Sequence, residues 1–221
     1  MEQSLLICAY RSLSVSTHDA VVALLSRPGW KHTVRSGDAL ISRARSIVVS
    51  QWLLQTSDDV FVMADDDIVF TPEDAEALVE KCRAGYDIIS AGIPVHNGQY
   101  IAVRPAPHVK LDLHAPEPLE MEYVGAAFVA VHRRVIEALV PLHTLCHPTM
   151  PIAFWPLYQP LVMELDGLPV YLSEDWAFVH KARNVGFRAW LDPTLRVGHR
   201  SEITLTADTM EEFHRIFGEH W

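Results

Sequence analysis

The first hundred residues alternate between short apolar segments and segments with helical periodicity, and this alternation limits the possible folds more than any other feature. Four segments are predicted to be strands: SLLICA (4–9), KHTVR (31–35), DVFVMA (59–64) and YDIISAGI (86–93). Three helices are predicted between them, ending near Arg27, Gln55 and Gly85. Strands that alternate with helices form a parallel sheet that is covered by helices on both faces. The sequence therefore predicts an α/β fold.

Capping residues mark where two of these helices begin. Ser16 or Thr17 is predicted to cap the first helix. The third helix has a stronger signal, with Thr71 as the cap, Pro72 at the first helical position and two acids in the first turn. Proline fits that position because its missing N–H is not needed there, and acids favour the positive end of the helix dipole.

The second half of the chain is predicted to contain strands of mixed direction rather than parallel strands alone. Strands are expected at YIAVRPA (100–106), HVKLDL (108–113), EYVGAAFVAV (122–131), FRAWL (187–191) and TLRVGH (194–199). Residues 141–171 contain six prolines and no clear period, and we predict a long functional loop packed over a site. Ser173 is predicted to cap a helix that Gly186 ends, and residues 207–221 are predicted to form a terminal amphipathic helix.

Charge, cysteine content and hydropathy argue against several classes of protein. The formal net charge of −10 argues against nucleic acid as a non-specific partner, because phosphate backbones attract basic surfaces. Three widely separated cysteines suit reduced thiols better than a disulfide framework. The N-terminal residues lack a signal-peptide pattern, and no window approaches the ~18 apolar residues of a membrane span. We therefore expect a soluble, cytoplasmic protein.

Three consecutive aspartates, Asp65, Asp66 and Asp67, directly follow the apolar segment 59–64. Ligands of parallel α/β sheets bind at the carboxyl ends of the strands, where these acids should lie. Carboxylates in one tight turn suit a hard divalent cation such as Mg²⁺ or Mn²⁺. A bound cation would reverse the local charge, so that the site could accept a diphosphate. The alternative is an exposed acidic turn that merely precedes a helix.

Two shorter motifs follow later in the chain. Glu174 and Asp175 fall in the first turn of the predicted helix after Ser173, where acids also serve as simple capping residues. His199 ends the segment Arg196-Val197-Gly198-His199, and a single histidine of this kind is usually a surface or core residue. Neither motif identifies a function by itself.

The order of the three motifs resembles that of metal-dependent glycosyltransferases of the GT-A fold, close to the large family-2-like group. The resemblance extends from ICAYR (7–11) to His199, and its most specific part is the ordered set of DxD strand, ED helix, Gly-Phe strand and Gly-His pair. The segment GDALISRARSIVVSQWLL (37–54) resembles the family's helix with Ala-Arg-Asn, although Ser46 occupies the Asn position here. The segment YVGAAFVAVHRRVIEAL (123–139) resembles the small-residue loop, strand and helix beside the donor sugar.

The resemblance implies a single GT-A, Rossmann-like domain over residues 1–221, with a mixed central sheet and helices on both faces. Residues 1–100 would form the nucleotide-binding half, and residues 101–221 the acceptor-binding half with the C-terminal helix. The implied activity is transfer of a sugar from a nucleoside diphosphate sugar, a UDP-sugar or a GDP-sugar, to an acceptor hydroxyl. The implied cofactor is Mn²⁺ or Mg²⁺.

The resemblance also implies roles for individual residues. Asp67 and His199 would bind the metal, with Asp65 contributing directly or through water. Asp175 would act as the general base on the acceptor hydroxyl, which implies inversion, and Glu174 would bind acceptor hydroxyls or serve as the base instead.

Nucleotide contacts are expected from the end of the first strand, where Ala9, Tyr10 and Arg11 lie. Arg45 is expected to pair with phosphate, and Asp65 and Asp66 to lie beside the donor. Phe154, Trp155, Tyr158 and Trp176 are candidate sugar-stacking surfaces, although ordinary core packing explains each of them equally well.

Other functional classes stay open. Haloacid-dehalogenase-like phosphatases also use an apolar strand with DxD, in which the first aspartate is the nucleophile, but that strand is normally the first of the chain. Nucleotidyltransferases normally begin with a glycine-rich loop, and residues 7–16 contain no glycine. A non-catalytic sugar-nucleotide-binding protein is a further alternative. The segment His143-x-x-Cys146-His147 suggests zinc only weakly, because a fourth ligand is missing.

Overall fold

The computed structural model describes residues 2–94, 101–149, 152–165 and 167–200. The helices are α1 (Val15–Leu25), α2 (Ile41–Gln55), α3 (Pro72–Arg83), α4 (Arg133–Leu139), the 3₁₀ turn η1 (Val140–Leu142) and α5 (Glu174–Asn184). The strands are β1 (Gln3–Ala9), β2 (Trp30–Ser36), β3 (Val60–Asp65), β4 (Ile68–Val69), β5 (Ile88–Ala91), β6 (Val103–Pro105), β7 (Leu119–Val124), β8 (Phe128–His132), β9 (Leu161–Leu165), β10 (Leu168–Leu172), β11 (Ala189–Asp192) and β12 (Gly198–His199).

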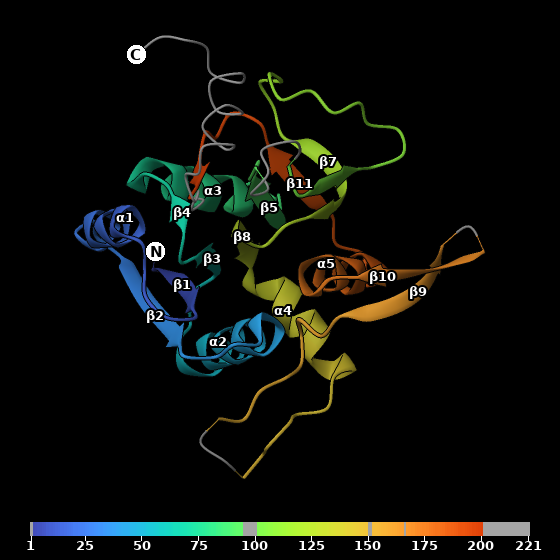
Figure 1. Cartoon of the computed structure of the whole chain (residues 1–221), viewed down its shortest axis with the longest axis horizontal. Helices are drawn as coiled ribbons and strands as arrows, with labels where there is room; N and C mark the ends of the chain where they lie inside the picture. Colours follow the sequence, from blue (N-terminus) through green and yellow to red (C-terminus); the bar gives the residue numbers. More distant parts are fainter. Residues whose placement is uncertain (1, 95–100, 150–151, 166, 201–221) are drawn as a thin grey trace, which may run out of the picture.

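The described residues form one central sheet of eight strands in the order β2-β1-β3-β8-β5-β11-β7-β6 (Figure 1). Strands β1, β2 and β3 are parallel, whereas β8 lies antiparallel between β3 and β5. Strand β11 is parallel to β5, and β7 is antiparallel to β11. The predicted α/β fold with a mixed central sheet is therefore confirmed.

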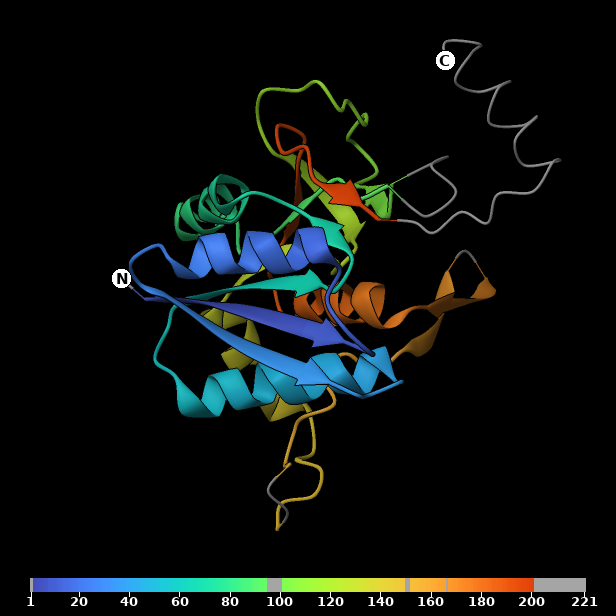
Figure 2. The same ribbon diagram turned by 60° about the vertical axis from the view of Figure 1, so that its left-hand side comes forward.

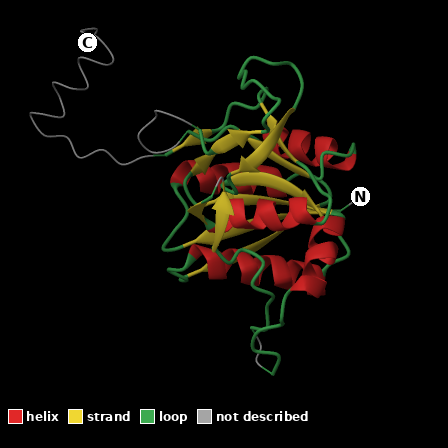
Figure 3. Cartoon of the chain, turned by 90° about the vertical axis from the view of Figure 1, so that its right-hand side faces the viewer, coloured by secondary structure: helices red, strands yellow, loops and turns green. Residues whose placement is uncertain are grey.

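Helices cover both faces of this sheet, as the sequence predicts. One apolar cluster contains residues of α1 and α3, and the other contains residues of α2, α4 and α5. Figure 2 shows α1 and α2 on opposite sides of β1, β2 and β3, and Figure 3 shows helices on both sides of the strands. Strand β1 is buried along its whole length, which explains why residues 5–9 are continuously apolar rather than alternating.

The first helix begins earlier than the sequence predicts. Ser14, rather than Ser16 or Thr17, is the N-cap, and its hydroxyl accepts a hydrogen bond from the Thr17 N–H at 3.1 Å. The Ser14 N–H donates to the carbonyl of Asp66 at 2.8 Å, so a contact with the acidic turn selects this serine. At α3 the prediction is confirmed, because Thr71 and Asp74 form a reciprocal capping box.

Two predictions for the second half are wrong. Residues 108–113 form turns rather than a strand, in a segment with prolines on both sides. The predicted strand 122–131 is two strands, because residues 125–127 leave the sheet between β7 and β8. Strands β7 and β8 run in the same direction, because both are antiparallel to β5 and β11. The break therefore moves the chain past β11 and β5, and β8 pairs between β3 and β5.

The predicted long loop at residues 141–171 is also wrong in part. Its last third forms the antiparallel hairpin β9–β10, which projects from the body of the protein in Figures 1 and 2. Earlier in the segment, the N–H groups of Trp155 and Tyr158 donate to the hydroxyls of Ser50 and Ser46, each at 3.0 Å. Buried serines on α2 therefore anchor this segment against the sheet. Of residues 141–149, 152–165 and 167–171, which the structure describes, none lines either cavity described below.

Two further predictions concern the C-terminal residues and membrane-spanning helices. The C-terminal helix predicted for residues 207–221 lies outside the described residues. Among the described residues, no helix has the length and apolar character needed to cross a membrane.

Candidate functional site

The three aspartates follow β3 at the carboxyl edge of the sheet, as the sequence predicts. Asp65 is the last residue of β3, and its N–H donates to the carbonyl of Ala127 at 2.9 Å. The carboxylate of Asp66 accepts a hydrogen bond from the N–H of Tyr10 at 3.2 Å, which joins the turn to the end of β1. Burial raises the pKa of Asp66, and the neighbouring carboxylates of Asp67 and Asp65 raise it further. The turn is therefore a site where a cation would be stabilised.

His199 lies directly beside Asp67. The pairing of β12 with β4 places His199 opposite Ile68, and the imidazole Nε2 lies 3.2 Å from Asp67 Oδ2. On the other side of the ring, Nδ1 donates to the carbonyl of Pro94 at 2.8 Å, because a carbonyl can only accept. In the neutral ring the Nε2 lone pair then faces a carboxylate oxygen, an arrangement that requires a proton or a cation between the two atoms.

The chemistry of this pair fits a divalent cation. Adjacent ligands of an octahedral Mg²⁺ centre lie about 3 Å apart, since each is about 2.0–2.1 Å from the metal. The observed separation of 3.2 Å is close to that value. A histidine ligand also commonly donates its second N–H to a backbone carbonyl, as His199 does. Among the described residues, no group of three or more His, Cys, Asp or Glu side chains is placed to hold a metal ion. The weak suggestion of zinc at His143, Cys146 and His147 therefore has no support within this part of the chain.

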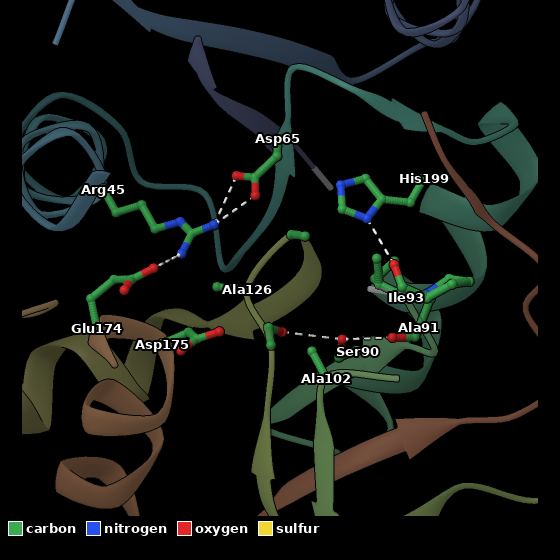
Figure 4. Close-up of a pocket in the computed structure, with 13 residues that line it drawn as sticks. Arg45, Asp65, Ser90, Ala91, Ile93, Ala102, Ala126, Glu174, Asp175 and His199 are labelled. Carbon is green, nitrogen blue, oxygen red and sulfur yellow. Dashed lines mark hydrogen bonds and ion pairs between the residues drawn. The ribbon is translucent and has the colours of Figure 1, made fainter. Parts of the chain in front are cut away.

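Arg45 connects two carboxylates from different parts of the chain. From α2, its Nη2 donates to both oxygens of Asp65 at 2.8 Å, and its Nη1 donates to Glu174 at 2.6 Å (Figure 4). The guanidinium is almost fully buried. Burial alone would lower the pKa of Arg45, but the two carboxylates outweigh it and raise the pKa. Burial raises the pKa of Glu174, and Asp175 adds to the effect while Arg45 opposes it.

Asp175 lies at the start of α5 and is held by two hydrogen bonds. Its Oδ1 accepts from the hydroxyl of Ser173 and from the N–H of Trp176. Neither bond involves Oδ2, which faces Gly125, since a Cβ added to that glycine would lie 3.6 Å from Oδ2. Figure 4 shows the carboxylate directed into the cavity from the end of the helix. One oxygen thus fixes the side chain while the other faces the cavity.

Two cavities meet at this group of residues. The cavity beside Asp175 has a volume of about 210 Å³ and is lined by Arg45, Asp65, Ser90, Ala91, Ile93, Pro94, Ala102, Gly125, Ala126, Ala127, Glu174, Asp175 and His199. The cavity beside Tyr10 has a volume of about 260 Å³ and is lined by Cys8, Ala9, Tyr10, Asp38, Ala39, Ile41, Ala44, Asp65, Asp66, Asp67 and His199. Asp65 and His199 line both, so the two cavities adjoin at the acidic turn.

Most residues that the sequence identifies as candidates thus surround these two cavities. The exceptions are Arg11, whose guanidinium lies over the ring of Tyr10, and the predicted sugar-stacking aromatics. Tyr158 is stacked on Phe178, and Trp176 is stacked on Tyr123. These rings pack against other aromatic side chains and do not line either cavity.

The sequence reasoning missed two residues of the site. Asp38 is a buried carboxylate in the cavity beside Tyr10, and both of its oxygens accept hydrogen bonds from Arg43. The hydrogen bond from Arg43 lowers the pKa of Asp38. Gly125 lies in the segment compared to the small-residue loop but was not named as a site residue, and a Cβ added to it would lie 3.2 Å from the Cβ of Ala102. A Ser-Gly-Asp sequence after a strand was the available signal for Asp38.

Comparison with known proteins gives a likeness of fold only. No family model matches the sequence, and no curated protein matches it. Among solved structures, the chain is similar to "A197 from STIV", with a TM-score of 0.60 and 16% identity over 91% of this chain and 87% of that one. It also matches glucosyl-3-phosphoglycerate synthase from Mycobacterium tuberculosis, solved with Mn²⁺, UDP and phosphoglyceric acid, at a TM-score of 0.48 and 12% identity, over 97% of this chain and 75% of that one. The first likeness shows a shared fold.

Proposed function

We propose that this chain is a metal-dependent glycosyltransferase of the GT-A type, which transfers a sugar from a UDP-sugar to an acceptor hydroxyl with inversion. One observation carries the proposal: the Asp67–His199 pair and the carboxylate of Asp175 border adjoining cavities that share Asp65 and His199. The site thus has three consecutive parts: the cavity beside Tyr10, the Asp67–His199 pair and the cavity beside Asp175. A nucleoside diphosphate sugar also has three consecutive parts, namely a nucleoside, a diphosphate and a sugar.

The cavity beside Tyr10 suits the nucleoside. Tyr10 is half exposed, so its ring is accessible to a base. Asp38 offers carboxylate oxygens to the N–H groups of a base, and its lowered pKa keeps it ionised. The exposed ring of Tyr10 could stack on any base, whereas the Asp38 carboxylate favours a base that presents N–H donors, as uracil and guanine do.

Asp67 and His199 would hold the divalent cation, and the diphosphate would lie at the boundary between the cavities. A cation bound there supplies charge neutralisation to the departing nucleoside diphosphate. A pair of protein ligands is sufficient, because Mg²⁺ is usually bound through one or two carboxylates together with substrate phosphates and water. Asp65 would support this site through Arg45, which holds both of its carboxylate oxygens.

Asp175 would remove the proton from the attacking hydroxyl. The hydrogen bonds from Ser173 and Trp176 fix Oδ1, which leaves Oδ2 directed toward the cavity for proton transfer. Glu174 is the weaker candidate for the base, because Arg45 already donates to its carboxylate. A phosphatase that used Asp65 as nucleophile would first have to separate both carboxylate oxygens from Arg45.

The test is nucleotide binding followed by donor hydrolysis. UDP, GDP, CDP and dTDP are compared by thermal shift with and without Mn²⁺, and we expect stabilisation by UDP that requires the metal. Asp67→Asn and His199→Ala should abolish the metal-dependent part of that stabilisation. Asp175→Asn should retain binding but lower the rate of UDP-sugar hydrolysis by about 10²–10⁴-fold, the usual contribution of a general base.

Asp19→Asn is the matched control, because it removes a carboxylate on the exposed side of α1, away from both cavities. It should leave binding and hydrolysis unchanged. Metal-dependent UDP binding without hydrolysis in the wild-type chain would identify a non-catalytic binding protein instead. No stabilisation by any of the four nucleotides would reject the proposal.

A further inference from the structure

The cavity beside Asp175 carries an excess of negative charge. Three carboxylates line it, those of Asp65, Glu174 and Asp175. Within the described part of the chain, the basic side chains that line it are Arg45 and His199. The other lining residues are small or apolar, apart from one serine. The selectivity of this cavity for charge therefore depends on what the two basic side chains can still bind.

Arg45 is already paired with two carboxylates. Its Nη1 donates to Glu174, and its Nη2 donates to both oxygens of Asp65. Its Nε is buried, with no hydrogen-bond partner among the described residues and no contact with solvent. Hydrogen bonds between a guanidinium and a carboxylate are strong, so an anion would have to compete with two carboxylates that already bind this guanidinium.

Both ring nitrogens of His199 are also engaged in contacts with other groups. Its Nδ1 donates to the carbonyl of Pro94, and its Nε2 faces the carboxylate of Asp67. Under the proposed function, Nε2 binds the cation and therefore offers no donor to the sugar. The imidazole thus adds no cationic group that could pair with an anionic substituent.

The formal charges of the lining side chains sum to −2, from three carboxylates and one guanidinium, with His199 counted as neutral. The cavity has a volume of about 210 Å³. In a cavity of this size, an anionic group on the ligand would lie close to the carboxylates, and like charges at short range repel each other.

We propose that this cavity selects a neutral transferred sugar and rejects one that carries a carboxylate or phosphate group. The proposal rests on the function proposed above, because it assigns the sugar of the donor to this cavity. It adds a specificity to that function: Glu174 and Asp175 repel acidic sugars, and Arg45 is prevented from attracting them.

The test compares two donors that differ in charge but share their nucleotide and ring stereochemistry. Calorimetry with Mn²⁺ gives the Kd values of UDP, UDP-glucose and UDP-glucuronate for the full chain. We expect the Kd of UDP-glucuronate to be at least about tenfold higher than that of UDP-glucose, because like charges placed close together in a binding site lower the affinity. Glu174→Gln should reduce this ratio, because it removes one negative charge and releases Nη1 of Arg45.

Glu73→Gln is the control, because this glutamate lies in the first turn of α3 and lines neither cavity. It should leave the ratio of the two Kd values unchanged. Equal binding of the two donors, or a ratio that Glu174→Gln does not alter, would overturn the charge selection while leaving the glycosyltransferase proposal intact. Failure of UDP itself to bind would reject the proposed function and this inference together.

Discussion

Replacing Arg45 by methionine tests whether the two halves of the site are held together by one buried guanidinium. Methionine has a similar length and fills the volume, so the main change is the loss of charge and hydrogen bonds. The substitution leaves Asp65 and Glu174, whose side chains are 23% and 18% exposed, without their common partner. Removal of one partner from a buried ion pair leaves an uncompensated charge, which is strongly destabilising.

The expected loss of stability follows from this geometry. Breaking a buried pair costs about 3–5 kcal/mol, and the partial exposure of both carboxylates places Arg45→Met near the lower limit, about 3 kcal/mol. For a chain of this length, each kcal/mol lowers Tm by about 2–4 °C, so we expect a decrease of about 6–12 °C. Thermal and urea unfolding, followed by circular dichroism, would measure both quantities.

Arg27→Met is the matched control, because Arg27 pairs with Glu73 on the surface, where the side chains are 43% and 64% exposed. An exposed pair contributes only about 0.2–1 kcal/mol. In addition, Asp65→Asn in the Arg45→Met background should restore part of the lost stability, because it removes one of the unpaired charges. The reasoning is refuted if Arg45→Met destabilises the chain no more than Arg27→Met does.

Three further predictions concern the cavity wall, the dependence of folding stability on acidic pH, and the reactivity of the thiols. Gly125→Ala should weaken UDP-sugar binding measured by calorimetry, because the new Cβ lies 3.2 Å from Ala102, whereas Gly92→Ala, with contacts of 3.6 Å or more, should not. The hydrogen bond from Arg83 lowers the pKa of Asp59, so ionised Asp59 should stabilise the folded chain. Asp59→Asn should therefore lower the free energy of unfolding above the ordinary pKa of 3.8, and the difference from wild type should disappear as the pH falls through the lowered pKa. Urea titrations across that pH range would measure the difference. At mildly alkaline pH, a thiol reagent should modify only Cys146 in the folded chain, because burial raises the pKa of the other two thiols, and all three should react after unfolding.

The sequence by itself determined the features that depend on neighbouring residues. The alternation of apolar strands and amphipathic helices in residues 4–93 predicted the α/β layers, and the Thr71 cap with Pro72 and the acids of the first turn predicted the start of α3. The position of three aspartates after a buried strand predicted that they would lie at the carboxyl edge of the sheet. These signals are local, because periodicity and capping reflect the backbone conformation of a few adjacent residues.

The tertiary structure decided the contacts between distant segments. The sequence gives no local signal that β8 inserts antiparallel between β3 and β5, or that residues 161–172 form a hairpin. Arg45 was predicted to pair with phosphate, but it lies between Asp65 and Glu174, the latter 129 residues away along the chain. Such partners are chosen by the free energy of burying charge and apolar surface together, which depends on the packed arrangement of all the layers. A chain can therefore encode which side chains reach one edge of a sheet, while the packing of the whole domain decides which of them face each other.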